Sequence, residues 1–155
     1  MYETVDRPRY VIPGLAGIYA ALETYSWPLI RVATGLFFVP HGMQKLFGFW
    51  GGDLAKYAEG FAKLGLQPGT LWATYIGCLE LFGGILLVVG LLTRPVAALF
   101  IGFMAVAAFH VTIQRGWFWS GGGMEVPLYL LLICIAILIR GGGALSVDRA
   151  LGREV

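Results

Sequence analysis

The stretch WPLIRVATGLFFVPHGMQKLF, residues Trp27 to Phe47, sets the fold class. It is long and apolar enough to cross a bilayer as one helix, since a hydrocarbon core of roughly 30 Å needs about 20 helical residues. Its second half nevertheless holds Pro40, His41, Gln44 and Lys45. Polar and ionisable side chains inside a membrane segment are expensive and mark functional sites. The segment therefore predicts a membrane helix with a site near its end.

The composition of the whole chain supports a membrane protein. Of its 155 residues, 58% are hydrophobic and 13% are charged, whereas soluble domains carry about 25% charged residues. The net charge of +2 lacks the basic excess of nucleic-acid-binding proteins, so nucleic acid is not an expected partner. The two cysteines, Cys78 and Cys134, lie inside apolar runs and are interpreted as small buried hydrophobic residues.

Three further apolar runs follow the first one. The predicted membrane helices cover residues 27–47, 70–92, 95–113 and 124–140, so that residues 27–140 form a four-transmembrane-helix bundle of an all-α membrane protein. Three prolines lie in the first turns of these runs, where a missing N–H is tolerated. They are Pro28, Pro95 and Pro127. Pro40 lies inside the first run, where it removes the bond to the carbonyl of Leu36 and predicts a kink.

The segments outside these runs also carry helical patterns. In the N-terminal segment, residues 1–26, apolar residues recur at helical spacing and predict a short interfacial helix. Between the first two runs, Asp53 caps a predicted amphipathic helix that ends at Gly65 and lies on the membrane surface. The tail is residues 141–155, where we expect Asp148 to form an ion pair with Arg31 or Arg94 that pins the tail.

An even number of spans places both termini on one side of the membrane. The positive-inside rule assigns the side with more lysine and arginine to the cytoplasm. Six such residues lie on the side of the termini and four on the other. We therefore expect a bacterial inner-membrane protein with both termini in the cytoplasm.

Connectivity also predicts where the ionisable residues meet. The end of the first span, the end of the third and the start of the fourth share one leaflet, which brings together His41, Lys45, His110 and Glu125. Glu80 lies about ten residues into the second span, hence roughly 15 Å deeper. We predict a polar pocket with Glu80 at its floor and the other four on its walls.

Other polar and aromatic residues belong to the same prediction. Gln44 lies three residues after His41 on the same helical face. The aromatic loop before the fourth span supplies a roof for the pocket from Trp117, Phe118 and Trp119. Two simpler readings stay open: the charged pairs only hold helices together, and Lys45 and Glu125 reach the headgroups. A metal or a haem on the histidines is a weaker alternative, because no short ligand motif is present.

Four motifs give the chain a family resemblance. They are RVATGLFFVPHGMQKLFGFWGG, GCLELFGGILLVVGLLTRPVAALF, AFHVT and GGGALSVDRAL. Within them, HGxxKL, ExxGGxLLxxGLLTR and SxDR occur in this order, and the chain resembles the DoxX family of small four-helix bacterial membrane proteins. That resemblance implies a link to membrane oxidoreductases, including one similar to a thiosulfate:quinone oxidoreductase subunit. The positions carried over from the family pattern are His41, Lys45, Glu80, Arg94, His110 and Asp148.

We therefore expect a redox-associated membrane subunit that binds a quinone or a similar lipophilic molecule in the pocket. His41 and His110 would contact carbonyl oxygens or relay protons, Glu80 would exchange protons and Lys45 would polarise the bound molecule. Further contacts to the molecule are assigned to Gln44, Glu125 and Trp117.

Electrons must come from elsewhere, because the chain holds no flavin, haem or iron–sulfur motif of its own. We expect a soluble or membrane redox partner, docked on the amphipathic helix and the aromatic loop. A scaffold that recruits a redox enzyme is the alternative function. A transporter of a small solute or proton is a third, and would require a homo-oligomer.

Overall fold

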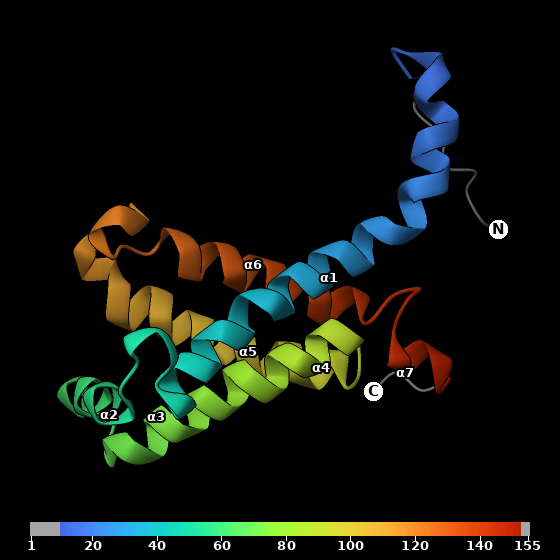
Figure 1. The fold of residues 1–155 in the computed structure, drawn as a ribbon. Coiled ribbons are helices and arrows are strands. Elements are labelled where there is room, and N and C mark those ends of the chain that lie inside the picture. Colours follow the sequence, from blue (N-terminus) through green and yellow to red (C-terminus); the bar gives the residue numbers. More distant parts are fainter. Residues whose placement is uncertain (1–9, 153–155) are drawn as a thin grey trace.

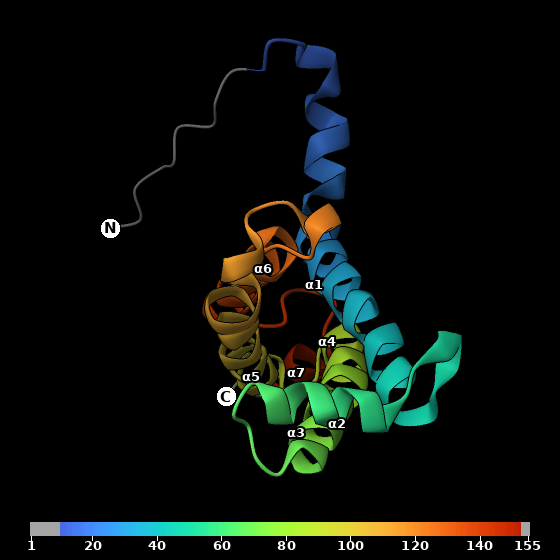
Figure 2. The same ribbon diagram turned by 90° about the vertical axis from the view of Figure 1, so that its left-hand side faces the viewer.

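The computed structural model describes residues 10–152, and its regular structure in that part of the chain is helical, without a strand. Residues 1–9 of the predicted N-terminal segment and residues 153–155 of the predicted tail lie outside it. The longer helical elements are α1 (Ala16–Phe47), α2 (Leu54–Lys63), α3 (Gly69–Cys78), η3 (Leu79–Gly83), α4 (Gly84–Val89), α5 (Thr93–Val106), η4 (Ala107–Thr112), α6 (Glu125–Arg140) and α7 (Val147–Ala150). Loops and short 3₁₀ turns connect them. Seen end-on, α1, α4, α5 and α6 surround a common centre and α2 lies across one end (Figure 2).

The first helix is longer than predicted. α1 has 32 residues and runs without interruption from Ala16 to Phe47, about 48 Å at 1.5 Å per residue. The helix before Pro28 is therefore not a separate element, and Pro28 does not begin a helix. The interfacial location of this N-terminal part and the start of the span stay predictions. Pro28 and Pro40 both lie inside the helix, and α1 changes direction within its blue N-terminal half (Figure 1), as expected where a proline removes a backbone hydrogen bond.

Two helical stretches are long and apolar enough to cross a membrane within residues 10–152: Gly69–Val89 and Thr93–Arg115. They correspond to the second and third predicted spans. The fourth predicted span corresponds to α6, which has 16 residues. For α1 and α6 the assignment as spans rests on the sequence.

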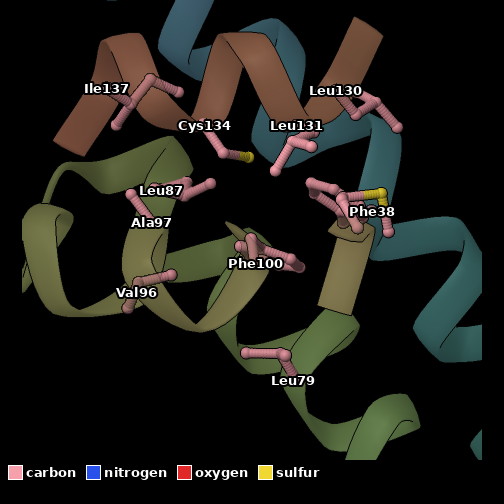
Figure 3. Close-up of a cluster of buried hydrophobic side chains, with 11 residues drawn as sticks. Phe38, Leu79, Leu87, Val96, Ala97, Phe100, Leu130, Leu131, Cys134 and Ile137 are labelled. Atoms are coloured by element: carbon pink, nitrogen blue, oxygen red, sulfur yellow. The ribbon is translucent and has the colours of Figure 1, made fainter. Parts of the chain in front are cut away.

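The hydrophobic core lies where α1, α4, α5 and α6 meet. Phe38 of α1 stacks on Phe100 of α5 with 3.9 Å between ring centroids, and both side chains are fully buried. Leu87, Cys134 and Ile137 close the core from α4 and α6 (Figure 3). The prediction that Cys134 is a small buried hydrophobic residue is confirmed, whereas Cys78 is half-buried.

Glycines let the backbone of α1 pack directly against the backbone of the continuous run formed by α3, η3 and α4. A methyl group on Gly35 would lie 2.5 Å from the carbonyl oxygen of Gly84, and one on Gly42 would collide with the backbone nitrogen of Leu81. On the facing helix, a methyl on Gly77 would lie 2.9 Å from the side chain of Leu46. We call Gly35, Gly42, Gly77 and Gly84 the glycine seam, and it fixes which residues of the two helices face each other.

α2 forms where the amphipathic pattern predicts it. Asp53 is its N-cap and accepts a hydrogen bond of 2.9 Å from the backbone N–H of Ala55. The helix packs closely on the start of α3, because a methyl group on Gly69 would collide with the carbonyl oxygen of Ala58. The aromatic loop between α5 and α6 lies at the same end of the bundle as α2 (Figure 1). A location at the membrane surface stays a prediction.

The tail is fixed to the opposite end of the bundle by hydrogen bonds. Trp27 donates to the carbonyl of Gly141 at 2.9 Å, and the fully buried Arg31 donates to the carbonyl of Leu145 at 2.5 Å. Asp148 accepts from the backbone N–H groups of Leu92 and Thr93 at 2.8 and 2.9 Å. Asp148 therefore caps the N-terminus of α5, a role that the expected ion pair did not include.

Removal of this cap gives a testable prediction. Burial by itself raises the pKa of Asp148, but the hydrogen bonds from Thr93 and Leu92 and the charge of Arg31 outweigh it and hold the pKa below its ordinary value. We expect Asp148→Asn to lower the free energy of unfolding in detergent micelles by about 1 to 2 kcal/mol at pH 7. Because the folded-state pKa is depressed, the carboxylate stabilises the fold fully above about pH 4 to 5, and this contribution is lost as the pH falls through the folded-state value.

The measurement is a set of unfolding curves for the wild type and Asp148→Asn between pH 3 and pH 7. The difference between the two proteins should shrink toward the acid end of the range. A difference that is independent of pH would contradict the assignment of a charged cap.

Candidate functional site

A buried ion pair joins the two helices at the glycine seam. The ammonium Nζ of Lys45 lies 2.7 Å from Oε2 and 2.9 Å from Oε1 of Glu80, so it donates to both carboxylate oxygens. Glu80 is 4% exposed, and the side chain of Lys45 is 12% exposed. Such a pair is held in a medium where each charge alone would be costly. The predicted meeting of Lys45 and Glu80 is confirmed.

The backbone at Glu80 departs from an α-helix. Residues Leu79–Gly83 form the π-helical turn η3 between α3 and α4. Such turns are rare, contain one extra residue and occur frequently at functional sites. Here the extra residue belongs to the segment that faces α1 across the glycine seam. The apolar run predicts a helix around Glu80, but its residue pattern carries no signal for the π-helical turn.

Lys45 also contacts α2 through Tyr57. Its Nζ lies 5.1 Å from the centroid of the Tyr57 ring, and the Tyr57 hydroxyl donates a hydrogen bond of 3.0 Å to Oε1 of Gln44. Burial raises the pKa of Tyr57, and the negative charge of Glu80 raises it further. The tyrosine is therefore a neutral donor that links the surface helix to the ion pair.

Tyr57 is a site residue that was not predicted, because its spacing along the predicted amphipathic helix places it on the apolar face. A tyrosine on that face offered a signal, since a buried hydroxyl needs a polar partner. Gln44, one residue before Lys45, is that partner.

A cavity of about 170 Å³ opens beside the ion pair. His41, Lys45 and Glu80 contribute its polar groups, and the ring of His41 lies 4.9 Å from that of Phe37. The remaining wall is apolar or aromatic and is formed by Phe37, Phe38, Met104, Trp119, Val126, Pro127 and Leu130. Three of the four residues predicted as catalytic therefore line one small cavity, together with one tryptophan of the predicted roof.

His110 does not join them, and its predicted position on the pocket wall is wrong. Its side chain is exposed, whereas Met104, Ala108 and Thr112 on the same helix are buried. These buried residues recur every four positions, and His110 lies two positions from Ala108 and from Thr112, on the opposite face. The π-helical turn η4 contains both His110 and Thr112. Chain connectivity predicted the depth of His110 but not its face.

Three other predicted contacts lie beside the cavity rather than in its wall. Glu125 is exposed and accepts a hydrogen bond of 3.0 Å from the backbone N–H of Trp119, so it holds the loop before α6. Trp117 is 53% exposed. Gln44 points to Tyr57. In each case a residue one or two positions later lines the cavity instead: Lys45 after Gln44, Trp119 after Trp117 and Val126 after Glu125.

No three His, Cys, Asp or Glu side chains of residues 10–152 lie close enough together to hold a metal ion. His41 lines the cavity and the exposed His110 does not, so the two histidines are not brought together there. The groups that the cavity offers are an ammonium, a carboxylate and an imidazole inside an aromatic wall. Such groups can donate and accept hydrogen bonds and carry protons.

Comparison with known proteins places these features in a family. The DoxX family model matches residues 26–113, which contain α2, the ion pair, His41 and most of the cavity wall. A protein of Bacillus subtilis (strain 168) with the name "Putative oxidoreductase CatD" is 32% identical over 120 residues, which cover 77% of this chain and 82% of that protein.

A second relative carries a location in its name. The "Inner membrane protein YphA" of Escherichia coli (strain K12) is 32% identical over 132 residues, covering 78% of this chain and 86% of that protein. No solved structure matches this chain with significance. In both relatives the similarity extends over most of the protein and not over a single motif.

Proposed function

This chain belongs to the DoxX family of membrane proteins, and we propose that it is a membrane subunit of an oxidoreductase system that binds a quinone or a similar small lipophilic redox molecule. The cavity beside Lys45 and Glu80 is the proposed site. The observation that carries the proposal is a buried ion pair on a π-helical turn that opens onto an aromatic cavity.

The proposed membrane arrangement has four spans: α1, the run from α3 to α4, the run from α5 to η5 (Ile113–Arg115), and α6. α1 packs along α4 and α6 packs along α5, so the two helices assigned from the sequence flank the two that meet the length and hydropathy requirements. With four spans and the excess of basic residues beside the termini, both termini lie in the cytoplasm and the cavity lies in the non-cytoplasmic half of the bacterial inner membrane.

The size and polarity of the cavity suit the ring of a quinone. Its volume of about 170 Å³ is below the roughly 300 to 1,000 Å³ of sites that enclose a whole drug-sized ligand, so a ring enters and an isoprenoid tail stays outside. A quinone supplies a two-electron, two-proton redox couple. The wall residues Phe37, Phe38 and Trp119 offer ring faces for stacking.

The polar groups have distinct roles in this proposal. Lys45 has three ammonium protons and gives hydrogen bonds to both oxygens of Glu80, which leaves it able to donate one to a carbonyl oxygen in the cavity. Glu80 holds or releases a proton at Oε1 or Oε2, and His41 lies on the same wall as a second group able to carry one. Together they provide a donor and a proton route at one ring.

The electron donor is a partner in this proposal. The chain holds no flavin, haem or iron–sulfur motif, and the name of the Bacillus subtilis relative is that of an oxidoreductase. A soluble or membrane-bound redox enzyme would deliver electrons at the end of the bundle where α2 and the aromatic loop lie.

Retention of a quinone by the purified protein tests the proposal. The protein is reconstituted in nanodiscs with ubiquinone or menaquinone, washed and extracted, and the quinone per protein is measured by mass spectrometry. We expect His41→Ala and Glu80→Gln to lower retention at least tenfold, because the first removes the imidazole from the cavity wall and the second replaces its ionisable carboxyl group with an amide. His41 makes no part of the ion pair, so its variant separates loss of the site from loss of the fold.

The chain offers a matched control for each variant. His110→Ala and Glu125→Gln remove the same chemical groups outside the cavity wall and should retain quinone as the wild type does. Equal retention by all five proteins would contradict the proposed site. A protein that retains no quinone but recruits a redox enzyme to the nanodisc would be the scaffold, and one that carries solute flux without quinone would be the transporter.

A further inference from the structure

A second and larger cavity lies on the other side of Tyr57. It is an open groove of about 720 Å³ between α2, α3 and the run from α5 to η5. Apolar and aromatic side chains make up most of its wall, among them Tyr57, Phe61, Trp72, Leu99 and Phe103. The residues of the ion pair do not line it, so the proposed quinone site leaves this groove without a role.

The charged residues that line the groove are all positively charged. Lys56 and Lys63 of α2 and Arg115 of η5 line it, and no Asp or Glu does. All three are exposed. α2 and the end of the run that closes with Arg115 lie at the same end of the bundle (Figure 1). The cations therefore gather at one end of an otherwise apolar groove.

The groove extends from this cationic end into the depth of the bundle. Its α5 wall runs from Arg115 back to Ala98, roughly 25 Å along a helix at 1.5 Å per residue. The hydrocarbon of one leaflet is about 15 Å deep, so the groove is long enough for an acyl chain. Cations at one end and an apolar channel behind them match the charge and shape of an anionic amphiphile.

We propose that this groove binds an anionic phospholipid of the bilayer, with its headgroup at Lys56, Lys63 and Arg115 and an acyl chain along α3 and α5. Juxtamembrane lysine and arginine attract anionic headgroups, and the apolar wall holds the chain. A second copy that met the groove with the same face would bring the same three cations to it, so charge complementarity favours the lipid over such a symmetric dimer.

Quenching of tryptophan fluorescence measures this binding. The full-length protein in neutral detergent is titrated with phosphatidylglycerol that carries brominated acyl chains, or with phosphatidylcholine of the same chains. Trp72 lines the groove, and the difference between the wild type and Trp72→Phe isolates its signal. We expect saturable quenching of Trp72 with at least a fivefold preference for phosphatidylglycerol.

Two variants address the two ends of the groove. The triple variant Lys56→Gln, Lys63→Gln, Arg115→Gln removes the cations, so its binding ratio of phosphatidylglycerol to phosphatidylcholine should fall to about one. Gly102→Leu should lower binding of both lipids at least fivefold, because Gly102 lines the groove and a leucine there would occupy part of it. A Cβ atom at this position meets no atom within 4 Å, so the new side chain starts in open space.

Matched controls keep the charge and volume changes while leaving the groove intact. Arg149→Gln removes an exposed cation at the opposite end, and Gly17→Leu adds a side chain at another glycine with open space around it. Both should behave as the wild type. A headgroup preference that survives the triple replacement would overturn the proposal, as would undiminished quenching in Gly102→Leu. If Trp72→Cys formed cross-linked dimers in the same yield with and without lipid, the groove would be assigned to a second copy instead.

Discussion

Replacing Lys45 with methionine is expected to lower the free energy of unfolding by about 3 to 5 kcal/mol. The replacement keeps an unbranched side chain of similar length but leaves the carboxylate of Glu80, which is 4% exposed, without the ammonium that now lies 2.7 Å from it. A buried charge without a partner is among the costliest defects in a fold. Reversible unfolding in mixed micelles of a mild detergent and SDS, followed by circular dichroism, measures the difference.

A double replacement distinguishes the cost of leaving one buried charge unpaired from the contribution of the ion pair itself to the free energy of unfolding. Lys45→Met combined with Glu80→Gln removes both charges, and we expect it to recover at least half of the loss, since exchanging a buried ion pair for neutral groups is often close to neutral. Lys56→Met, on the exposed side of α2, is the control and should change the free energy by less than about 0.5 kcal/mol. If Lys45→Met matched this control, the ion pair would have no role in stability.

The second large effect is expected from a single methyl group. Gly42→Ala should lower the free energy of unfolding by about 3 kcal/mol, at the upper end of what overpacking costs. The added carbon would collide with the backbone nitrogen of Leu81 and lie 2.8 Å from the carbonyl oxygen of Gly77. These are backbone atoms on another helix and cannot rotate away, so α1 must move away from α3 and η3.

Displacement of α1 should also open the functional site. Lys45 lies one turn after Gly42, so we expect Gly42→Ala to lose quinone in the nanodisc assay as well as stability. Gly102→Ala is the matched control, because it lies within α5 and its new methyl group meets no atom within 4 Å. It should be neutral or slightly stabilising, since alanine favours a helix over glycine. Equal stability of the two variants would show that the glycine seam is loosely packed.

The positions of the helices could be read from the sequence because their signals are local. Apolar runs, the cap at Asp53 and the helix-ending glycines each depend on a few neighbouring residues, and the helices of the structure begin and end close to them. The continuation of α1 through Pro28 could not be read in this way. A proline is compatible with a helix start and with a bend inside a longer helix, and the local sequence does not distinguish the two.

The site was predicted in part for a related reason. Lys45 and Glu80 meet because connectivity fixes depth in the membrane and because leaving either group facing lipid is expensive. The face of a helix depends on its exact number of residues per turn, which the π-helical turns η3 and η4 change. The predicted direction of His110 is therefore wrong, whereas its predicted depth stays a prediction. Tyr57 was missed because its partner Gln44 lies on a different helix.

The π-helical turn at Glu80 makes the site depend on a count of residues as well as on their identity. Deleting one residue between Leu79 and Gly83 would restore regular α-helical hydrogen bonding with α3 and α4 close to their present orientation, because the π-helical turn accommodates one extra residue, but it would move Glu80 around the helix axis. Gly84 could then stay on Gly35 only if Glu80 turned away from Lys45. In evolutionary terms, the loss of one residue from this turn is a different kind of change from a substitution. The shortened helix could not keep both the glycine seam and the ion pair.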